Sequence, residues 1–132
     1  MKSIVCVGMM LLCLVVCKGT DCAPNTALDG KWKQVDVISG QQLLGFEVEF
    51  KNSQGLITSV NSNPFGFRIS DVVWRDTRAE TNSIYDVQVL TRSTNGTSSY
   101  GSWKIVILPG GKSLAFTRPG NTTDVYERWE RM

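Results

Sequence analysis

The chain has 132 residues, of which 42% are hydrophobic, with 14 lysines and arginines, 12 aspartates and glutamates, and no histidine. This length provides one domain with a sizeable core and not two. Because histidine is absent, Ser-His-Asp and Cys-His catalytic systems and the usual zinc sites are excluded.

The first segment of the chain has the pattern of a secretory signal peptide. A short basic start precedes residues 4–16, which are almost wholly apolar. That run is shorter than the about 20 residues that cross a membrane, and polar sequence follows it. We expect cleavage near Gly19/Thr20, which gives a signal peptide at residues 1–19 and a secreted, extracellular domain at residues 20–132. A signal anchor and a bacterial lipoprotein are the alternatives, although no small residue precedes Cys17 as lipidation requires.

The secreted part has balanced charge and one cysteine. Removal of Lys2 and Lys18 lowers the 14 basic residues to 12, equal to the 12 acidic ones. We therefore expect no nucleic-acid partner and, after signal removal, no membrane partner, because the electrostatic attraction that drives such binding is missing. Cys22 has no partner for an internal disulfide, so a packed core must stabilise the domain. Cys22 either forms an intermolecular disulfide in a dimer or remains a thiol.

Short runs of alternating apolar and polar residues dominate the rest of the chain and predict β-strands. In the clearest run, Phe46, Val48 and Phe50 share one face, opposite Glu47 and Glu49. The predicted strands are residues 31–38, 46–51, 56–60, a longer strand from Phe65 through Phe67 and Ile69 toward Trp74, residues 84–91, 103–107, 114–117 and 124–131.

Eight antiparallel strands with short connections favour an all-β fold: a single eight-stranded antiparallel up-and-down barrel. Closure removes exposed edges and leaves an interior wide enough for one small ligand. An immunoglobulin-like sandwich is the alternative, but its Cys…Trp…Cys core is missing.

In an up-and-down barrel, alternate loops lie at the same end. One end is predicted to carry residues 39–42, 61–64, 93–101 and 119–123, and the other residues 52–55, 75–83 and 109–112. The first end has the roomier loops and is the expected entrance for a ligand. Asn95 and Asn121 begin two Asn-x-Thr glycosylation sequons in these loops. Alternatively, they are simply good turn formers.

Two short motifs at the ends of the domain resemble those of the calycin superfamily, which includes lipocalins, fatty-acid-binding proteins and avidins. The segment Leu28-Asp29-Gly30-Lys31-Trp32 is similar to the Gly-x-Trp opening of lipocalins and avidins, and Val125-Tyr126-Glu127-Arg128 is similar to the last strand of fatty-acid-binding proteins and small lipocalin-like domains.

The resemblance implies a barrel that binds a small, mainly apolar molecule. It places Trp32 at the barrel floor, with Arg128, or else Arg131, across its face in a cation–π contact. Asp124 occupies the position of the arginine with which fatty-acid-binding proteins hold a carboxylate, so the sequence carries no signature for a known ligand.

Aromatic residues on the predicted strands are the candidates for lining a ligand pocket, and their alternative role is to fill the core. These candidates are Phe46, Phe50, Phe67, Tyr85, Trp103, Phe116 and Tyr126.

Enzymatic activity, a cofactor and a metal are not expected. Glu47 and Glu49 form the one close carboxylate pair on a predicted strand, and they lie opposite the apolar face, where water solvates them.

Three functions remain open. The first is a secreted carrier of a small apolar ligand. The second is a structural, extracellular-matrix or secretion component whose barrel is filled. The third is a secreted inhibitor or toxin-like protein that acts through the barrel loops.

Overall fold

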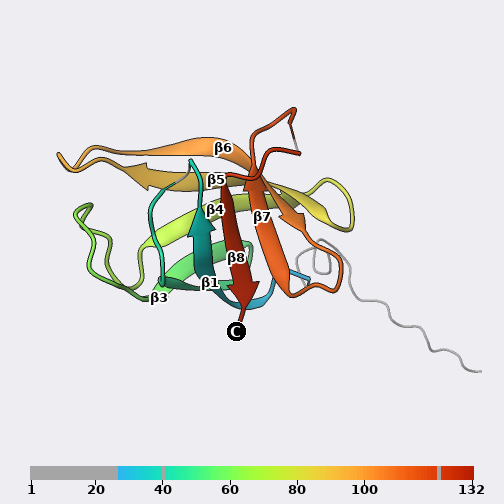
Figure 1. Cartoon of the computed structure of the whole chain (residues 1–132), viewed down its shortest axis with the longest axis horizontal. Helices are drawn as coiled ribbons and strands as arrows, with labels where there is room; N and C mark the ends of the chain where they lie inside the picture. The colour runs from blue at the N-terminus through green and yellow to red at the C-terminus, as the bar shows by residue number, and fades with distance from the viewer. Residues whose placement is uncertain (1–26, 40, 122) are drawn as a thin grey trace, which may run out of the picture.

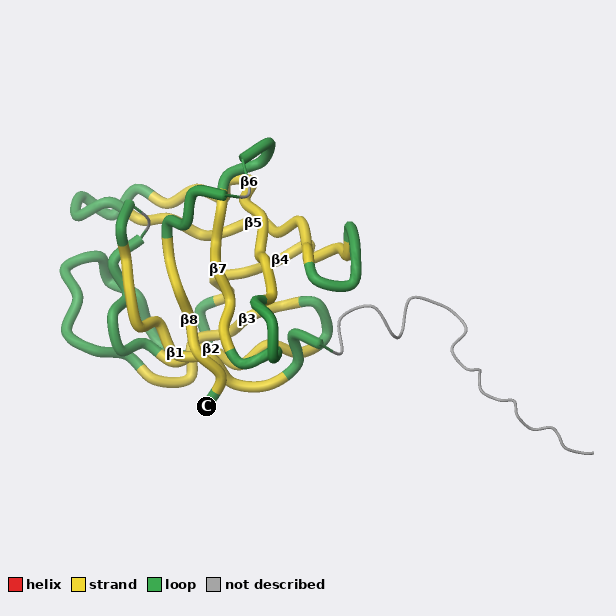
Figure 2. Tube along the Cα trace, turned by 45° about the vertical axis from the view of Figure 1, so that its right-hand side comes forward, coloured by secondary structure: helices red, strands yellow, loops and turns green. Residues whose placement is uncertain are grey.

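The computed structural model describes residues 27–39, 41–121 and 123–132, which form a closed antiparallel barrel of eight strands and no helix (Figures 1 and 2). The strands are β1 (Gly30–Val37), β2 (Glu47–Lys51), β3 (Gln54–Ser59), β4 (Val72–Ala79), β5 (Ile84–Arg92), β6 (Ser98–Ile107), β7 (Ser113–Thr117) and β8 (Glu127–Arg131). The predicted signal peptide and Cys22 lie outside the described residues.

Each strand pairs with its neighbour in sequence, and β8 closes the ring on β1. Trp32 of β1 is the partner of Val48 in β2 and of Arg131 in β8. The predicted up-and-down barrel is therefore confirmed, and the sheet has no free edge strand.

The two ends of the barrel differ in their connections. Tight turns dominate one end, which we call the floor end. Asn52 and Ser53 join β2 to β3 with φ angles of 55° and 64°, as a two-residue type I′ turn requires. The β1–β2, β3–β4, β5–β6 and β7–β8 loops lie at the other end, the mouth end.

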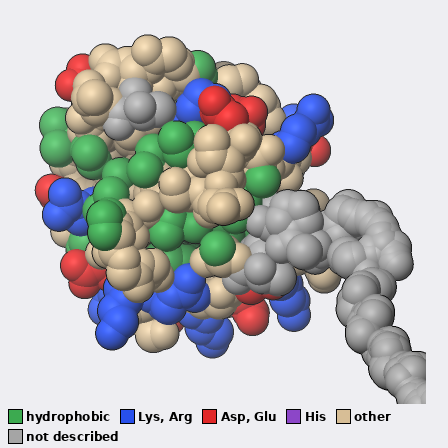
Figure 3. Space-filling model, turned by 90° about the vertical axis from the view of Figure 1, so that its right-hand side faces the viewer, with side chains coloured by type: hydrophobic (Ala, Val, Ile, Leu, Met, Phe, Trp, Pro, Cys, Tyr) green, Lys and Arg blue, Asp and Glu red, His purple; other side chains and the backbone are tan. Residues whose placement is uncertain are grey.

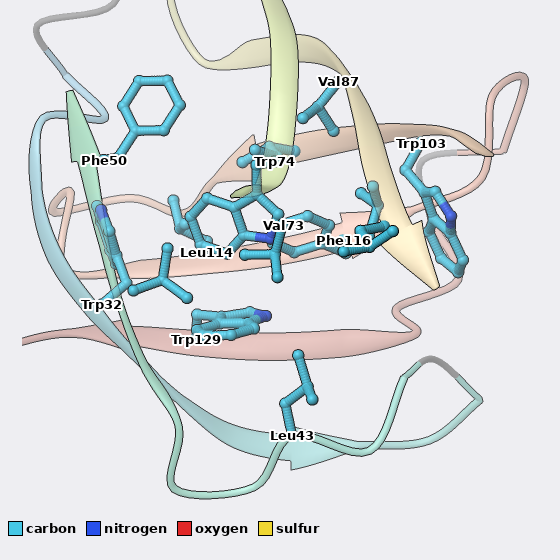
Figure 4. Close-up of a cluster of buried hydrophobic side chains, with 14 of the residues drawn as sticks. Trp32, Leu43, Phe50, Val73, Trp74, Val87, Trp103, Leu114, Phe116 and Trp129 are labelled. Carbon is cyan, nitrogen blue, oxygen red and sulfur yellow. The ribbon is translucent and has the colours of Figure 1, made fainter. Parts of the chain in front are cut away.

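Inward side chains fill the barrel around Trp74. Its ring lies 5.1 Å from Phe116 of β7 and 4.9 Å from Trp129 of β8 (Figure 4). Because β4 and β8 are opposite strands in a ring of eight, the Trp74–Trp129 contact spans the lumen. Gly55 of β3 makes room for this ring, since a Cβ there would lie 2.6 Å from Trp74 Cε3.

The strand predicted from Phe65 toward Trp74 is wrong up to residue 71, because residues 60–71 form a loop, and its last part from Val72 belongs to β4. Asn63 Oδ1 accepts hydrogen bonds from the backbone N–H groups of Phe65 and Phe67, at 3.2 and 3.1 Å. Gly66 and Ser70 have positive φ angles of 78° and 77°. Local side-chain bonds and left-handed residues replace the sheet ladder here, so the aromatic alternation does not produce a strand.

Three other boundaries also differ from the prediction. The polar run 75–83 is not a connection, since β4 continues to Ala79 through a bulge at which Asp76 has a φ of 53°. The loop predicted at 93–101 is shorter, because β6 begins at Ser98 and pairs with β5 along the hairpin that extends to the left in Figure 1. The last strand begins at Glu127 rather than at Asp124.

The surface carries both signs of charge. On the face in Figure 3, lysine and arginine side chains gather along the lower margin with carboxylates among them, and hydrophobic side chains form a band across the middle. The part of the chain that the structure describes has no helix of the length and apolarity that a membrane crossing requires.

Candidate functional site at the mouth end

The floor end is closed by Trp32 and Arg131. The Trp32 indole donates to the Leu28 carbonyl at 2.8 Å, and the Arg131 Cζ lies 4.2 Å from the centre of the Trp32 ring. Arg131 also donates to the carbonyls of Asp29 and Ala27, both at 2.8 Å.

The predicted contact of Arg128 with Trp32 is wrong. Side chains alternate along β8, so Arg128 points outward, whereas Arg131 is the register partner of Trp32. The floor is therefore a structural closure, made by the second of the two arginines that the resemblance allowed.

The seven predicted pocket residues lie in separate clusters rather than around one pocket. Phe50 and Phe116 pack on Trp74 in the middle of the barrel. Phe46 and Phe67 pack edge to face near the mouth end, with ring centroids 6.2 Å apart.

The other three candidates lie toward opposite ends. Trp103 and the half-buried Tyr126 pair at 5.3 Å on the mouth rim. Tyr85 is the second residue of β5 and therefore lies at the floor end, where burial and then the negative charge of Asp29 raise its pKa.

A recess of about 280 Å³ opens at the mouth end between the β1–β2 and β3–β4 loops. Its lining is polar and apolar in nearly equal parts and comprises Gln42, Leu44, Phe46, Ser62, Pro64 and Phe65. The two loops are tied together, since the Asn61 side-chain amide donates to the Leu44 carbonyl at 2.9 Å. We call this hollow the mouth recess.

Residues 41–44 separate the mouth recess from the barrel interior, and we call them the closing segment. Gln42 and Leu44 face the recess, whereas Leu43 is buried and points toward Trp129 (Figure 4). The Gln41 side chain accepts a hydrogen bond from the backbone N–H of Arg92 at 2.9 Å, which joins the segment to the end of β5.

Two buried polar side chains hold the closing segment from inside. Glu127 Oε2 accepts from the backbone N–H of Gln41 at 2.9 Å, and Gln34 Oε1 accepts from that of Leu43 at 2.7 Å. The Gln34 amide donates to Glu127 Oε1 at 3.1 Å, and so does the Trp129 indole. Both side chains are almost fully buried.

The environment of Glu127 disfavours its charged form. Burial raises the pKa of its carboxyl group, and the hydrogen bonds from Trp129, Gln41 and Gln34 lower it by less. No lysine or arginine of the described residues forms an ion pair with Glu127. The carboxylate therefore has neutral hydrogen-bond donors and no counter-charge.

Two arginines stack on aromatic rings around the mouth rim. The Arg118 Cζ lies 4.5 Å from the centre of the Trp103 ring. The Arg92 Cζ lies 5.0 Å from that of Phe67, and Arg92 also forms an ion pair with Asp71 at 2.9 Å. These contacts brace the β3–β4 and β7–β8 loops against the barrel.

Both sequon asparagines are exposed on mouth-end loops. Asn95 Oδ1 accepts from the backbone N–H of Thr97 at 3.0 Å, and Asn121 Oδ1 accepts from that of Thr123 at 3.2 Å. Each asparagine thus forms a turn with the residue two positions later, which is also the bonding expected of a plain turn former.

A second and larger hollow, of about 550 Å³, has a lining of mixed polarity and lies at the β4 bulge. It is lined by Asp76, Arg78, Asp86, Val87, Gln88, Ser102, Trp103 and Pro119. Asp86 and Arg78 are register partners on β5 and β4, and Gln88 donates to Ser102 at 2.9 Å. Asp86 also forms an ion pair with Lys104, and Asp76 with Arg75, so both carboxylates of this hollow already have a cationic partner.

Within residues 27–39, 41–121 and 123–132, no three histidine, cysteine, aspartate or glutamate side chains are grouped as metal ligands.

The sequence analysis missed the polar pair of Gln34 and Glu127. The signal was present, because each residue lies two positions from an inward tryptophan, Trp32 or Trp129, on the same strand. Nothing in the sequence indicated that the β1–β2 loop folds back over them.

Comparison of the chain with protein-family models, with curated proteins and with solved structures finds no match. The fold itself, a closed eight-stranded antiparallel barrel, is compatible with a calycin-like fold. The fold and the site define a barrel whose floor end is sealed by a tryptophan and an arginine and whose mouth end carries the closing segment and the mouth recess.

Proposed function

We propose that the chain is a secreted, lipocalin-like carrier that binds one small, mainly apolar molecule at the mouth end of the barrel. The observation that carries this proposal is the mouth recess, which lies beside the closing segment. Its volume of about 280 Å³ is near the lower limit of ligand pockets, which is about 300 Å³. The ligand is therefore small.

The packing of the barrel limits how deep the ligand reaches. Trp74 and Trp129 meet across the lumen, so the part of the barrel toward the floor end has no room for a ligand without loss of core packing. Phe46 lines the recess, and the buried Phe67 packs on its ring. The site thus lies among the mouth-end loops and not in the packed lumen.

A binding titration with an apolar fluorescent probe tests this proposal. Leu44→Asp places a charge in the recess at a side chain that is half exposed, so we expect probe affinity to fall at least about tenfold while stability changes by less than about 0.5 kcal/mol. Val35→Asp is the matched control, since Val35 is exposed on β1 outside the recess. Equal binding by both variants and the unchanged protein would contradict the proposed site.

Native mass spectrometry of protein purified from its source tests the carrier role directly. A retained organic mass supports a carrier, and an N-terminus at Thr20 supports secretion after signal cleavage. A mass equal to that of the bare polypeptide, with its glycans, would count against a carrier.

A structural role with a filled barrel is the second candidate, and the Trp74–Trp129 contact favours it. This role predicts that neither the apolar probe nor any natural ligand binds. It also allows a Cys22-linked dimer, which non-reducing electrophoresis detects as a band that collapses on reduction.

A further inference from the structure

Among the described residues, Glu127 is the one buried carboxylate. A carboxylate without a counter-charge is costly to keep in an apolar interior. Glu127 lies at the mouth end of β8, directly beneath the closing segment. The energetic cost of its burial is therefore located next to the proposed binding site.

The groups that face Glu127 come from three elements, and all are neutral. Gln34 donates from β1, the backbone N–H of Gln41 donates from the closing segment, and Trp129 donates from β8 itself. On β7, the register partner of Glu127 is the apolar Phe116. These bonds satisfy the carboxylate oxygens and leave the negative charge uncompensated.

One of these donors is replaceable. Gln34 and Trp129 belong to strands of the closed sheet, whereas Gln41 belongs to the segment that separates the recess from the interior. If the closing segment moves outward, Glu127 Oε2 loses its donor and faces the space that Leu43 leaves. A ligand that displaces the segment meets a carboxylate oxygen that has lost its donor.

We propose that the ligand of this barrel is a small amine, with an ammonium group that bonds to Glu127 Oε2 and an apolar frame that lies between Phe46 and the β3–β4 loop. This inference rests on the proposed function. A cation beside Glu127 supplies the missing counter-charge and forms a charge-assisted hydrogen bond. The recess of about 280 Å³ has room for a frame of one ring rather than a long chain.

Three probes of one shape and different charge test this proposal by isothermal titration calorimetry at neutral pH. Phenethylamine is a cation, 2-phenylethanol is neutral, and phenylacetate is an anion. We expect the amine to bind about ten- to a hundredfold more tightly than the alcohol, as a hydrogen bond to a charged group predicts. We expect phenylacetate not to bind.

The variant Glu127→Gln removes the charge and keeps the shape. It should bind the alcohol with unchanged affinity and lose the preference for the amine. Glu49→Gln is the matched control, because Glu49 lies on the outward face of β2 and should leave the preference intact. If Glu127→Gln does not fold, the probe series on the unchanged protein still decides, with the Trp129 indole N–H resonance as a second reading, since this group donates to Glu127.

The outcomes separate this inference from the proposed function. Equal affinity for the amine and the alcohol, or binding of phenylacetate, overturns the amine assignment, and the carrier role stands if the apolar probe still binds. If neither the three compounds nor the apolar probe binds, both are wrong.

Discussion

Both ends of this barrel are closed, but the charged side chain that takes part is exposed to water at one end and buried at the other. At the floor end, the exposed Arg131 lies over Trp32 and bonds to backbone carbonyls, so its charge remains in contact with water. At the mouth end, Glu127 is buried to hold the closing segment, and its charge is taken out of water. Burial of a carboxylate without a counter-charge lowers the stability of the fold, and such costly features are expected at functional sites. The mouth recess lies beside this one.

The largest effect belongs to the core that separates the two ends. Trp74→Ala should lower the free energy of unfolding by about 3–5 kcal/mol, because it removes the ring that packs on Phe116 and Trp129. Urea denaturation measures this change. A loss below about 1 kcal/mol would show that the lumen is loosely packed and that the ligand has more depth available than we infer.

The floor closure should depend on one of its two arginines. Arg131→Ala should cost about 1–3 kcal/mol, because it removes a cation–π contact and hydrogen bonds to two carbonyls of the first described segment. Arg128→Ala, on the outward face of β8, is the control and should stay within about 0.5 kcal/mol. A larger effect at Arg128 in the same denaturation assay would reverse the assignment.

The mouth closure should respond to pH through Glu127. Its pKa in the folded protein is raised above the ordinary value of 4.5, so the folded state holds the proton more tightly than the unfolded state does. The contribution of Glu127 to stability is thus fully present below pH 4.5 and is lost as pH rises through the folded pKa.

Denaturation of the unchanged protein and of Glu127→Gln across this range isolates that contribution. The difference in unfolding free energy between them should shift in favour of the unchanged protein as pH falls from neutral. None of the groups bonded to Glu127, from Gln34, Gln41 and Trp129, titrates in this range, so a constant difference would contradict the assignment.

The smallest effect is local to the closing segment. Gln41→Ala removes the acceptor of the Arg92 backbone N–H and should cost about 0.5–1.5 kcal/mol. Hydrogen exchange should accelerate at the amides of Leu43 and Arg92 and remain unchanged at the amide of Trp32. Uniform acceleration across the barrel would mean that the segment does not open independently of the rest.

Period-two alternation was sufficient to predict the barrel. At β2, Phe46, Val48 and Phe50 alternate with glutamates, and β5 alternates similarly around Val87. β7 is the exception, because Leu114 to Thr117 are all buried. Closure of β8 on β1 followed from the number of strands and the short connections between them. Alternation and connection length depend on residues that are close together in the sequence, so a single sequence is enough to show them.

The rest of the fold depends on contacts that alternation does not encode. Residues 65–69 alternate like a strand, yet the Asn63 side chain and Gly66 bend them into a loop. The fold of the closing segment depends on Glu127, which lies 86 residues from Gln41 in sequence. Six of the seven aromatic pocket candidates are buried and Tyr126 is half-buried, but their division among the floor end, the middle and the mouth end required the register of all eight strands.

The four tryptophans lie at different depths of the barrel, and their indole N–H resonances test the central claim most directly. In a titration with phenethylamine or the apolar probe, followed by ¹⁵N NMR, we expect the Trp129 resonance to shift, because its indole donates to Glu127. The Trp32 resonance should stay in place, since its indole is bonded to Leu28 at the floor end. A shift at Trp32 with none at Trp129 would place the ligand at the wrong end and contradict the account.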